Sequence, residues 1–332
     1  MMGRFRNSLE RYFNGLWYGQ SRPGLAWRAM SELYRFSTKG NEVDYRTFPP
    51  GPVIVVGNIT VGGGGKTPVV AALAELLKRD GRSPAIISRG YGGRSSIRPL
   101  RVQASDDPRL CGDEPLLLAR STGCPVWVCR RRHRAMHAAF DDGADVVLSD
   151  DGLQHIALPR SFEICVIDQA RGFGNRRLLP AGPLRQPLSR LDRVDLVLRK
   201  CSASPTADDG LPGLAFEMKA GVAYRLVDRL PEELDLGTHY DAVCGIANPE
   251  SFFATLESLG LSFRRHAFPD HHEYSGRDIS TLTGPLLVTE KDAVKLERLE
   301  GLPDTLVLPV RADLPGPVRQ TVLEHVRQFG RS

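Results

Sequence analysis

Short runs of consecutive apolar residues recur between positions 52 and 198, separated by stretches in which apolar residues have helical spacing. A strand that is buried on both faces carries such a continuous run, whereas a strand with one solvent face alternates. The pattern therefore predicts a parallel sheet with helices on both faces. The expected strands are residues 52–56, 83–88, 126–129, 146–148, 164–167 and 194–198, and the first helix is residues 68–79.

A second group of apolar runs follows residue 233 and predicts a smaller α/β unit. Between the groups, residues 201–213 are rich in Ser, Pro, Asp and Gly, which is typical of a linker. Residues 216–218 and 222–227 are expected to pair there as a two-stranded ribbon. The predicted domains are an N-terminal segment (1–36), a nucleotide-binding domain (37–200), a linker (201–232) and a C-terminal α/β domain (233–332). The second unit is expected to contain strands 240–245, 262–268, 286–289 and 306–310, and helices 249–259, 291–299 and 316–329.

The N-terminal segment has a helical pattern over residues 8–36 that residues 21–24 interrupt. Its second piece mixes Trp27 and Tyr34 with Arg28 and Arg35. Such a mixture is typical of a helix that lies on a membrane surface. It equally fits a helix that packs on its own domain.

Charge is concentrated in the same segment. The chain has a net charge of +5. Residues 1–50 carry eight basic and four acidic side chains, which leaves +4 there. A basic segment favours an anionic surface such as phospholipid or nucleic acid, although a solvated face is the alternative. The basic residues are Arg4, Arg6, Arg11, Arg22, Arg28, Arg35, Lys39 and Arg46, and the acidic residues are Glu10, Glu32, Glu42 and Asp44.

Composition narrows the class of protein. A hydrophobic fraction of 41% and a charged fraction of 25% are ordinary for a globular chain. The six cysteines form no C-x-x-C pair, which predicts buried thiols in a reducing, cytosolic compartment and argues against zinc. No apolar stretch reaches the roughly 18 residues of a membrane span, and no signal-peptide pattern is present.

A glycine-rich turn directly follows the first predicted strand, and the first predicted helix follows the turn. Backbone N–H groups of such a turn surround phosphate oxygens, the helix N-terminus adds positive potential, and Lys66 reaches the β- and γ-phosphates. Thr67 stands where a hydroxyl binds Mg²⁺, and Thr60 stands where the strict pattern has glycine. The expected ATP-binding residues are Thr60, Val61, Gly62, Gly63, Gly64, Gly65, Lys66 and Thr67.

Two acids, Asp150 and Asp151, end the strand predicted at 146–148. Enzymes with a phosphate loop hold Mg²⁺ with a carboxylate at the end of a neighbouring strand. We therefore expect Asp150 and Asp151, with Thr67, to hold the metal. Solvated turn acids are the alternative interpretation.

Taken together, the motifs make the chain resemble the tetraacyldisaccharide 4′-kinase family. They occur in the family's order from residue 55 to residue 295. The resemblance implies phosphate transfer from ATP to the 4′-hydroxyl of a lipid A disaccharide precursor, by a peripheral protein on the cytoplasmic face of the inner membrane. The motifs are VVGNITVGGGGKTP (55–68), ISRGYGG (87–93), GDEP (112–115), SDDGLQH (149–155), FGN (173–175), LPAGPLR (179–185), DHH (270–272) and VTEKDAVK (288–295).

The resemblance also implies catalytic roles. It makes Asp113 the acid near the sugar hydroxyl, and His271 its partner from the second domain, with the choice between His271 and His272 left open. Arg185 resembles an arginine that neutralises phosphate charge. The chain departs from the family at Gln186, where glutamate is frequent.

Two other functions fit the phosphate loop. One is a kinase for a soluble sugar or cofactor precursor, and the other is a partitioning-type ATPase switch. The basic, aromatic N-terminal segment argues against a soluble substrate, and a switch needs no acid–histidine pair. The Arg130–Arg134 run has no accompanying nucleic-acid motif, so we expect a solvated or phosphate-facing patch and no nucleic-acid partner.

Overall fold

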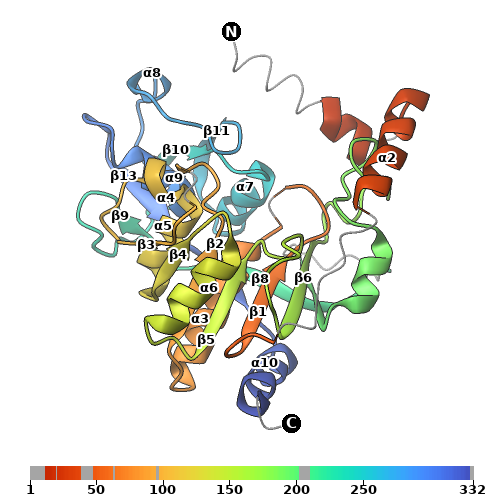
Figure 1. The fold of residues 1–332 in the computed structure, drawn as a ribbon. Helices are drawn as coiled ribbons and strands as arrows, with labels where there is room; N and C mark the ends of the chain where they lie inside the picture. The colour runs from red at the N-terminus through yellow and green to blue at the C-terminus, as the bar shows by residue number, and fades with distance from the viewer. Residues whose placement is uncertain are drawn as a thin grey trace.

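The structure is a computed structural model that describes residues 12–19, 21–38, 48–62, 64–94, 97–201 and 210–329. Within these ranges nine strands form the larger sheet, in the order β14-β8-β7-β6-β1-β5-β2-β4-β3 (Figure 1). Only β3 and β14 run antiparallel to their neighbours, which confirms the expected parallel sheet. The strands are β1 (Val53–Gly57), β2 (Pro84–Ser88), β3 (Leu100–Val102), β4 (Val126–Val128), β5 (Val146–Asp150), β6 (Phe162–Asp168), β7 (Leu196–Lys200), β8 (Leu214–Ala220) and β14 (Val310–Asp313).

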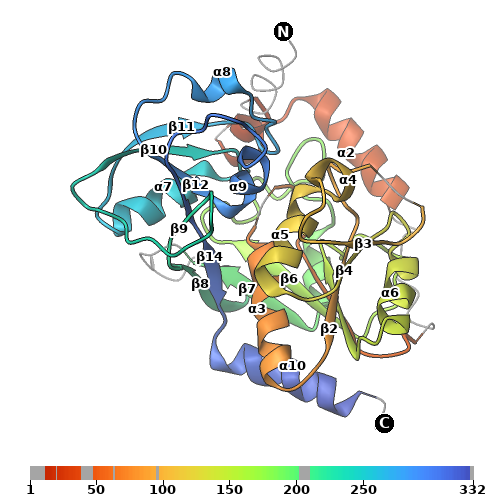
Figure 2. The same cartoon turned by 90° about the vertical axis from the view of Figure 1, so that its left-hand side faces the viewer.

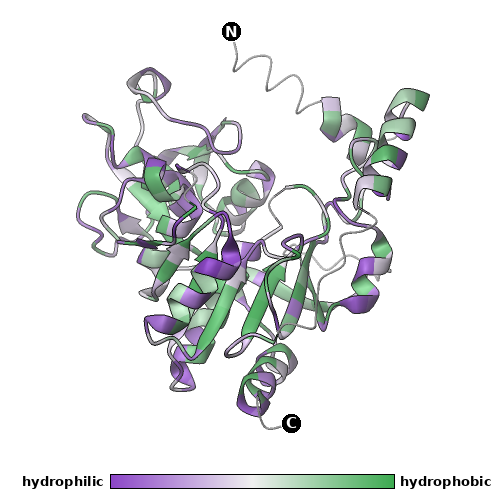
Figure 3. Cartoon of the chain, viewed as in Figure 1, coloured by the Kyte–Doolittle hydropathy of each residue, from purple (hydrophilic) through white to green (hydrophobic). Residues whose placement is uncertain are grey.

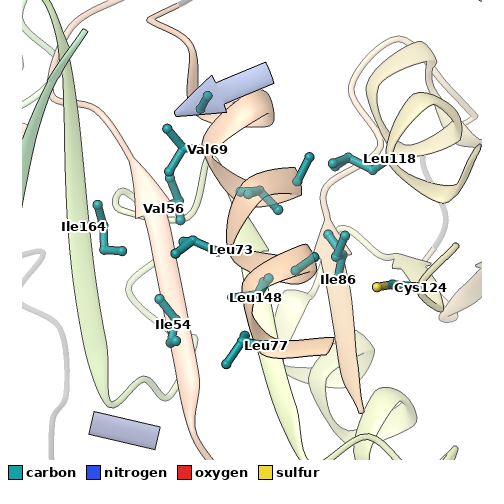
Figure 4. Close-up of a cluster of buried hydrophobic side chains, with 14 of the residues drawn as sticks. Ile54, Val56, Val69, Leu73, Leu77, Ile86, Leu118, Cys124, Leu148 and Ile164 are labelled. Carbon is teal, nitrogen blue, oxygen red and sulfur yellow. The ribbon is translucent and has the colours of Figure 1, made fainter. Parts of the chain in front are cut away.

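Both faces of the larger sheet are covered, which explains the continuous apolar runs. In β1, Ile54 and Val56 face one core while Val53 and Val55 face the other. Figure 4 shows side chains of α3 against the strands of the first core, and Figure 3 shows apolar residues gathered along these strands. The first core is covered by α3 (Lys66–Arg79), α5 (Asp113–Thr122) and α10 (Gly316–Gln328), and the second by α6 (Arg132–Asp141).

A smaller five-stranded sheet has the order β11-β10-β12-β13-β9 and is parallel except at β9. Its own apolar clusters include residues of α7 and α9. This confirms the expected second α/β unit. The elements of the unit are β9 (Tyr224–Arg225), β10 (His239–Cys244), α7 (Pro249–Ser258), β11 (Ser262–Ala267), α8 (Gly276–Ile279), β12 (Leu286–Thr289), α9 (Glu290–Leu296) and β13 (Thr305–Leu308).

The last strand and helix of the chain return to the larger sheet. β14 pairs with β8, and α10 lies beside α3 (Figure 2). The smaller unit is therefore inserted between β8 and β14, whereas the sequence placed all of residues 233–332 in one C-terminal domain. The expected ribbon is wrong in its partners, because residues 216–218 pair with β14 and β9 pairs with β13.

The N-terminal segment packs on a loop of the larger unit. Residues 12–18 are helical, and α2 covers Leu25–Thr38. Residues 1–11 and 20 of this segment, the linker residues 202–209, and Gly63 lie outside the described residues. Across the described ranges, every helix is too short or too polar to cross a bilayer. The remaining elements are α4 (Pro108–Cys111) and a 3₁₀ helix at Leu188–Arg193.

The packing of α3 yields a stability prediction. Leu73 is fully buried between α3 and the larger sheet. Leu73→Ala is expected to lower the free energy of unfolding by about 2–5 kcal/mol, because it removes apolar contacts and leaves a cavity. Chemical denaturation monitored by circular dichroism measures the change. Leu230→Ala, at an exposed site, should stay within about 0.5 kcal/mol, and a Leu73→Ala loss that small would contradict the assigned core.

Candidate active site

Parallel pairing brings the carboxyl ends of several strands to one edge of the larger sheet. Val56 of β1 is level with Asp150 of β5, and Asp168 of β6 is level with Lys200 of β7. A cleft of about 1780 Å³ opens at this edge and continues to the smaller unit. It is lined by the described glycines of the phosphate loop, by acids of β5 and β6, and by residues of α7 and α9. The cleft is therefore at the place where a doubly covered sheet binds its ligand.

The phosphate loop, residues 57–68, includes the end of β1, the turn that connects β1 to α3, and the first residues of α3. Gly62 and Gly65 have φ angles of 109° and 85°, which a side chain would strain. Helix α3 begins at Lys66, and Pro68 stands in its first turn as expected. Thr60, at the position of the missing glycine, bridges to Leu184, so the segment before Arg185 supports the loop. Gly63 lies outside the described residues, and Gly62, Gly64 and Gly65 line the cleft.

Lys66, Thr67, Asp150 and Asp151 meet at the mouth of the loop. The Lys66 ammonium lies 3.4 Å from Oδ1 of Asp151, and the Thr67 hydroxyl donates to Oδ2 of Asp150 at 3.2 Å. Burial by itself raises the pKa of Asp151, but Lys66, Arg185 and Arg132 hold that pKa well below its ordinary value. The two acids that the sequence paired thus have different partners.

Asp150 has the properties of a carboxylate that can bind a cation. It is 2% exposed, and its Oδ1 has no hydrogen-bond partner among the residues that the structure describes. Burial, followed by the charges of Glu114 and Asp151, raises its pKa well above the ordinary value. In the part of the chain that the structure describes, no three His, Cys, Asp or Glu side chains cluster as metal ligands. A Mg²⁺ ion needs no such cluster, because it is usually held by one or two protein oxygens with phosphates and water. Asp150 and Thr67 fit that pattern.

Arg185 faces the same acids. Its Nη1 donates to Oδ2 of Asp151 at 3.1 Å and to Oε1 of Gln154 at 3.2 Å. The backbone N–H of Arg185 donates to the carbonyl of Ile59, which fixes the arginine beside the phosphate loop. Gln186 accepts from the Gln154 amide, so in this chain an amide pair stands where the family often has glutamate.

The structure brings Asp113 and His271 together from opposite sides of the cleft. Asp113 begins α5 on the larger unit, and His271 stands in the loop before α8 on the smaller one. Nδ1 of His271 lies 3.0 Å from Oδ2 of Asp113. Burial by itself raises the pKa of Asp113, but the hydrogen bond with His271 and the charges of Lys291 and Lys295 hold that pKa well below its ordinary value. His272 instead contacts Asp278 at 3.4 Å.

Several charged residues in the cleft received no individual role from the sequence. Lys291 and Lys295 of α9 lie within 4.0 Å and 3.4 Å of Asp113. Lys200 pairs with Asp168 at 2.9 Å beneath the loop. Arg130, Arg131 and Arg132 also line the cleft, and Arg132 donates to the carbonyl of Asp151 at 2.6 Å. The sequence signal for Asp168 and Lys200 is that each ends a strand of the parallel sheet, Asp168 on β6 beside β1 and Lys200 on the next strand, β7.

The chain is similar to known proteins over most of its length. A family model described as tetraacyldisaccharide-1-P 4′-kinase matches residues 24–327. A tetraacyldisaccharide 4′-kinase of Halorhodospira halophila is 44% identical over 310 residues, covering 91% of this chain and 92% of the relative. One of Alkalilimnicola ehrlichii is 49% identical over 278 residues, covering 83% and 82%.

A solved structure, LpxK from Aquifex aeolicus in complex with ATP, has a similar fold. It superposes with a TM-score of 0.70 at 26% identity and covers 97% of this chain and 99% of its own. The family model spans most of the chain, and the relatives are similar over nearly their whole length. The chain belongs to the tetraacyldisaccharide-1-P 4′-kinase family.

Proposed function

We propose that the chain transfers the γ-phosphate of ATP to the 4′-hydroxyl of tetraacyldisaccharide 1-phosphate, a lipid A precursor. Family membership makes the chain an ATP-dependent kinase, a phosphotransferase with an alcohol group as acceptor. The observation that carries the proposal is one cleft with a phosphate loop on one side and an acid–histidine pair on the other. A nucleotide switch has no use for that pair, and the comparisons favour neither a switch nor a kinase for a soluble substrate.

The cleft supplies positive groups for the transferring phosphoryl group. Loop N–H groups and the N-terminus of α3 face the phosphate position, and Lys66 and Arg185 extend from two sides. Both cations also contact the carboxylate of Asp151, which balances its charge and holds the two side chains in place. They are therefore already oriented when phosphate oxygens enter, and little reorganisation is required during the reaction.

The geometry favours the imidazole of His271 as the proton acceptor, rather than the carboxylate of Asp113. Both oxygens of Asp113 have partners, Oδ1 with the N–H of Glu114 and Oδ2 with His271. Nε2 of His271 is the nitrogen that remains on the side away from Asp113. As the 4′-oxygen bonds to the γ-phosphorus and the bond to the β–γ bridging oxygen breaks, the hydroxyl proton passes to Nε2. The carboxylate of Asp113 stabilises the imidazolium that forms.

Mg²⁺ is the proposed metal, with Thr67 and Asp150 as its protein ligands. When bound, the ion would neutralise charge on the β- and γ-phosphates. Asp151 contributes indirectly in this proposal, since its carboxylate orients Lys66 and Arg185.

Peripheral attachment to the cytoplasmic face of the inner membrane is proposed from the surface of α2. Leu25, Leu33 and Phe36 are 80%, 72% and 80% exposed, while Ser31 is the buried residue of this helix. Ser31 and Tyr34 hydrogen-bond to the carbonyls of Leu178 and Arg185. The polar contacts hold the helix on the loop that carries Arg185, and its apolar side chains are left for a lipid surface next to the cleft.

The first functional prediction tests the phosphate loop. Lys66→Ala should reduce transfer of radiolabelled γ-phosphate to the lipid in detergent micelles by at least about 10²–10³-fold, because a preoriented charge at the phosphates is lost. Arg79→Ala, an exposed change on the same helix, is the control and should retain activity. Near-normal transfer by folded Lys66→Ala protein would show that the loop is not the site of phosphate binding.

The second functional prediction tests the acid–histidine pair. Asp113→Ala and His271→Ala should each lower kcat by about 10²–10⁴-fold with ATP affinity largely kept, because proton transfer is impaired. The double variant should be little worse than the worse single variant if the two act as one unit. His272→Ala is the matched control and should remain active. Losses that multiply, or a raised KM for ATP with normal kcat, would refute the pairing.

The third functional prediction concerns the membrane. A triple variant with Leu25, Leu33 and Phe36 changed to Ser should bind anionic phospholipid vesicles more weakly, as measured by co-sedimentation, and keep its ATP affinity. A control triple variant with Val227, Leu230 and Leu236 changed to Ser alters exposed apolar residues elsewhere. Equal vesicle binding by both triple variants would contradict attachment through α2.

A further inference from the structure

We propose that Lys291 is a positioning residue for the phosphoryl transfer, which holds His271 in place on Asp113 across the boundary between the two units. The inference rests on the proposed roles of Asp113 and His271. It adds a residue, a contact and a function that neither the motifs nor the comparisons assign to this lysine.

The position of Lys291 is unfavourable unless it has a specific partner. It is the second residue of α9, and a cation in the first turn of a helix opposes the helix dipole. Its side chain is only 14% exposed, so the ammonium has also lost most of its water. Burial by itself lowers the pKa of Lys291, yet the charges of Glu114, Asp270 and Asp113 raise that pKa well above its ordinary value. The ammonium is therefore kept charged by acids gathered around it.

Those acids come from both sides of the cleft. The Lys291 ammonium lies 3.0 Å from Oε1 of Glu114, on α5 of the larger unit. It also lies 3.0 Å from Oδ1 of Asp270, in the loop of the smaller unit. Its third contact is Nε2 of His271 at 3.4 Å. An ammonium has three N–H donors, so one group satisfies a carboxylate from each unit and the imidazole between them.

The contact with Nε2 determines how the imidazole is oriented. An ammonium can only donate, so Nε2 must accept, and the ring proton then lies on Nδ1, facing Asp113. The backbone of His271 has a φ angle of 59°, in the left-handed region that costs free energy for a residue with a side chain. Two contacts to Oδ1 of Asp270 hold this turn. One comes from the backbone N–H of His271, and the other comes from the Lys291 ammonium.

The same contact defines where the acceptor hydroxyl enters. Nε2 is the nitrogen proposed to take the proton, and the Lys291 ammonium lies 3.4 Å from it. The 4′-hydroxyl must therefore replace Lys291 on Nε2, while Glu114 and Asp270 keep the ammonium beside it. On its other sides, the His271 ring contacts Tyr91 and the carboxylate of Asp113. Lys295 contacts the same carboxylate.

A simpler explanation is that Lys291 only ties the two units together. Another ion pair across the same boundary separates the two explanations. Arg298, just beyond the end of α9, pairs with Asp107 of the larger unit at 2.9 Å. Among the described residues, no hydrogen bond or ion pair joins Arg298 to His271. If Lys291 acts only by joining the two units, Lys291→Met and Arg298→Met should both lower kcat, because each removes an ion pair between the units.

The experiment measures kcat, KM for ATP and KM for the lipid in micelles, in the full chain. Lys291→Met should lower kcat by about 10²-fold with little change in KM for ATP, because a misplaced imidazole loses its alignment with the hydroxyl. Arg298→Met should keep near-normal kcat. In a His271→Ala background Lys291→Met should cause almost no further loss, since residues that act as a unit are not additive.

Three results would overturn the proposal. They are equal losses in Lys291→Met and Arg298→Met, a loss from Lys291→Met that multiplies with that of His271→Ala, and full activity of Lys291→Met. If His271→Ala itself were fully active, the acid–histidine pair would fail and this proposal with it. Full activity of Lys291→Met beside an inactive His271→Ala would reject the role of Lys291 alone. Thermal unfolding verifies that each variant is folded, and Lys291→Gln, which keeps a polar donor, replaces Lys291→Met if that variant does not fold.

Discussion

The parallel pairing of β1 with β5 and β6 determines where the charged groups of the cleft lie. Parallel strands end at a common edge, so the phosphate loop after β1, Asp150 at the end of β5 and Asp168 at the end of β6 are neighbours without any contact between their loops being required. Two apolar faces hold these strands in register, because each strand buries alternate residues in opposite cores. The two apolar cores therefore position the charged residues at the carboxyl edge of the sheet, which could not form a core by themselves.

Charges that are removed from water at this edge must be balanced by other charges. Asp151 is balanced by Lys66 and Arg185, and Asp168 by Lys200. Asp150 differs from these two acids, since one of its oxygens has no partner within the described ranges. Burying a charge without a partner is costly, and sites that perform chemistry are where such groups are retained. The two adjacent aspartates thus have different roles. Asp150 is suited to binding a cation, whereas Asp151 orients the cationic side chains of Lys66 and Arg185.

The insertion of the smaller unit between β8 and β14 brings the second half of the site to the first. The connections into and out of the unit are adjacent, since β8 and β14 pair. Helix α9 consequently faces α5, and the loop with His271 reaches Asp113. The acid–histidine pair exists only while the two units are in contact, so the same contacts that join the units also assemble the groups proposed for proton transfer.

Local pattern predicted a large part of the molecule. The apolar runs predicted the covered parallel sheet, and the glycines before Lys66 predicted the turn, because a left-handed backbone and a helix start depend on neighbouring residues only. Asp150 and Asp151 could be expected near the loop, since strand ends in a parallel sheet share an edge. The motifs suggested that Asp113 and His271 act together, but only through resemblance to a family.

Tertiary structure decided the features that depend on which core a residue joins. Apolar spacing shows that α10 faces a core, and it cannot tell whether that core belongs to the larger sheet or to the smaller one. The same spacing could not tell that α2 buries Ser31 and exposes Leu33, because hydrogen bonds to a distant loop outweigh its apolar side chains. Asp113 and His271 are 158 positions apart, and Lys291 is 177 positions from Glu114. Contacts between residues so far apart in the sequence depend on how the two units pack, and no local sequence pattern predicts that packing.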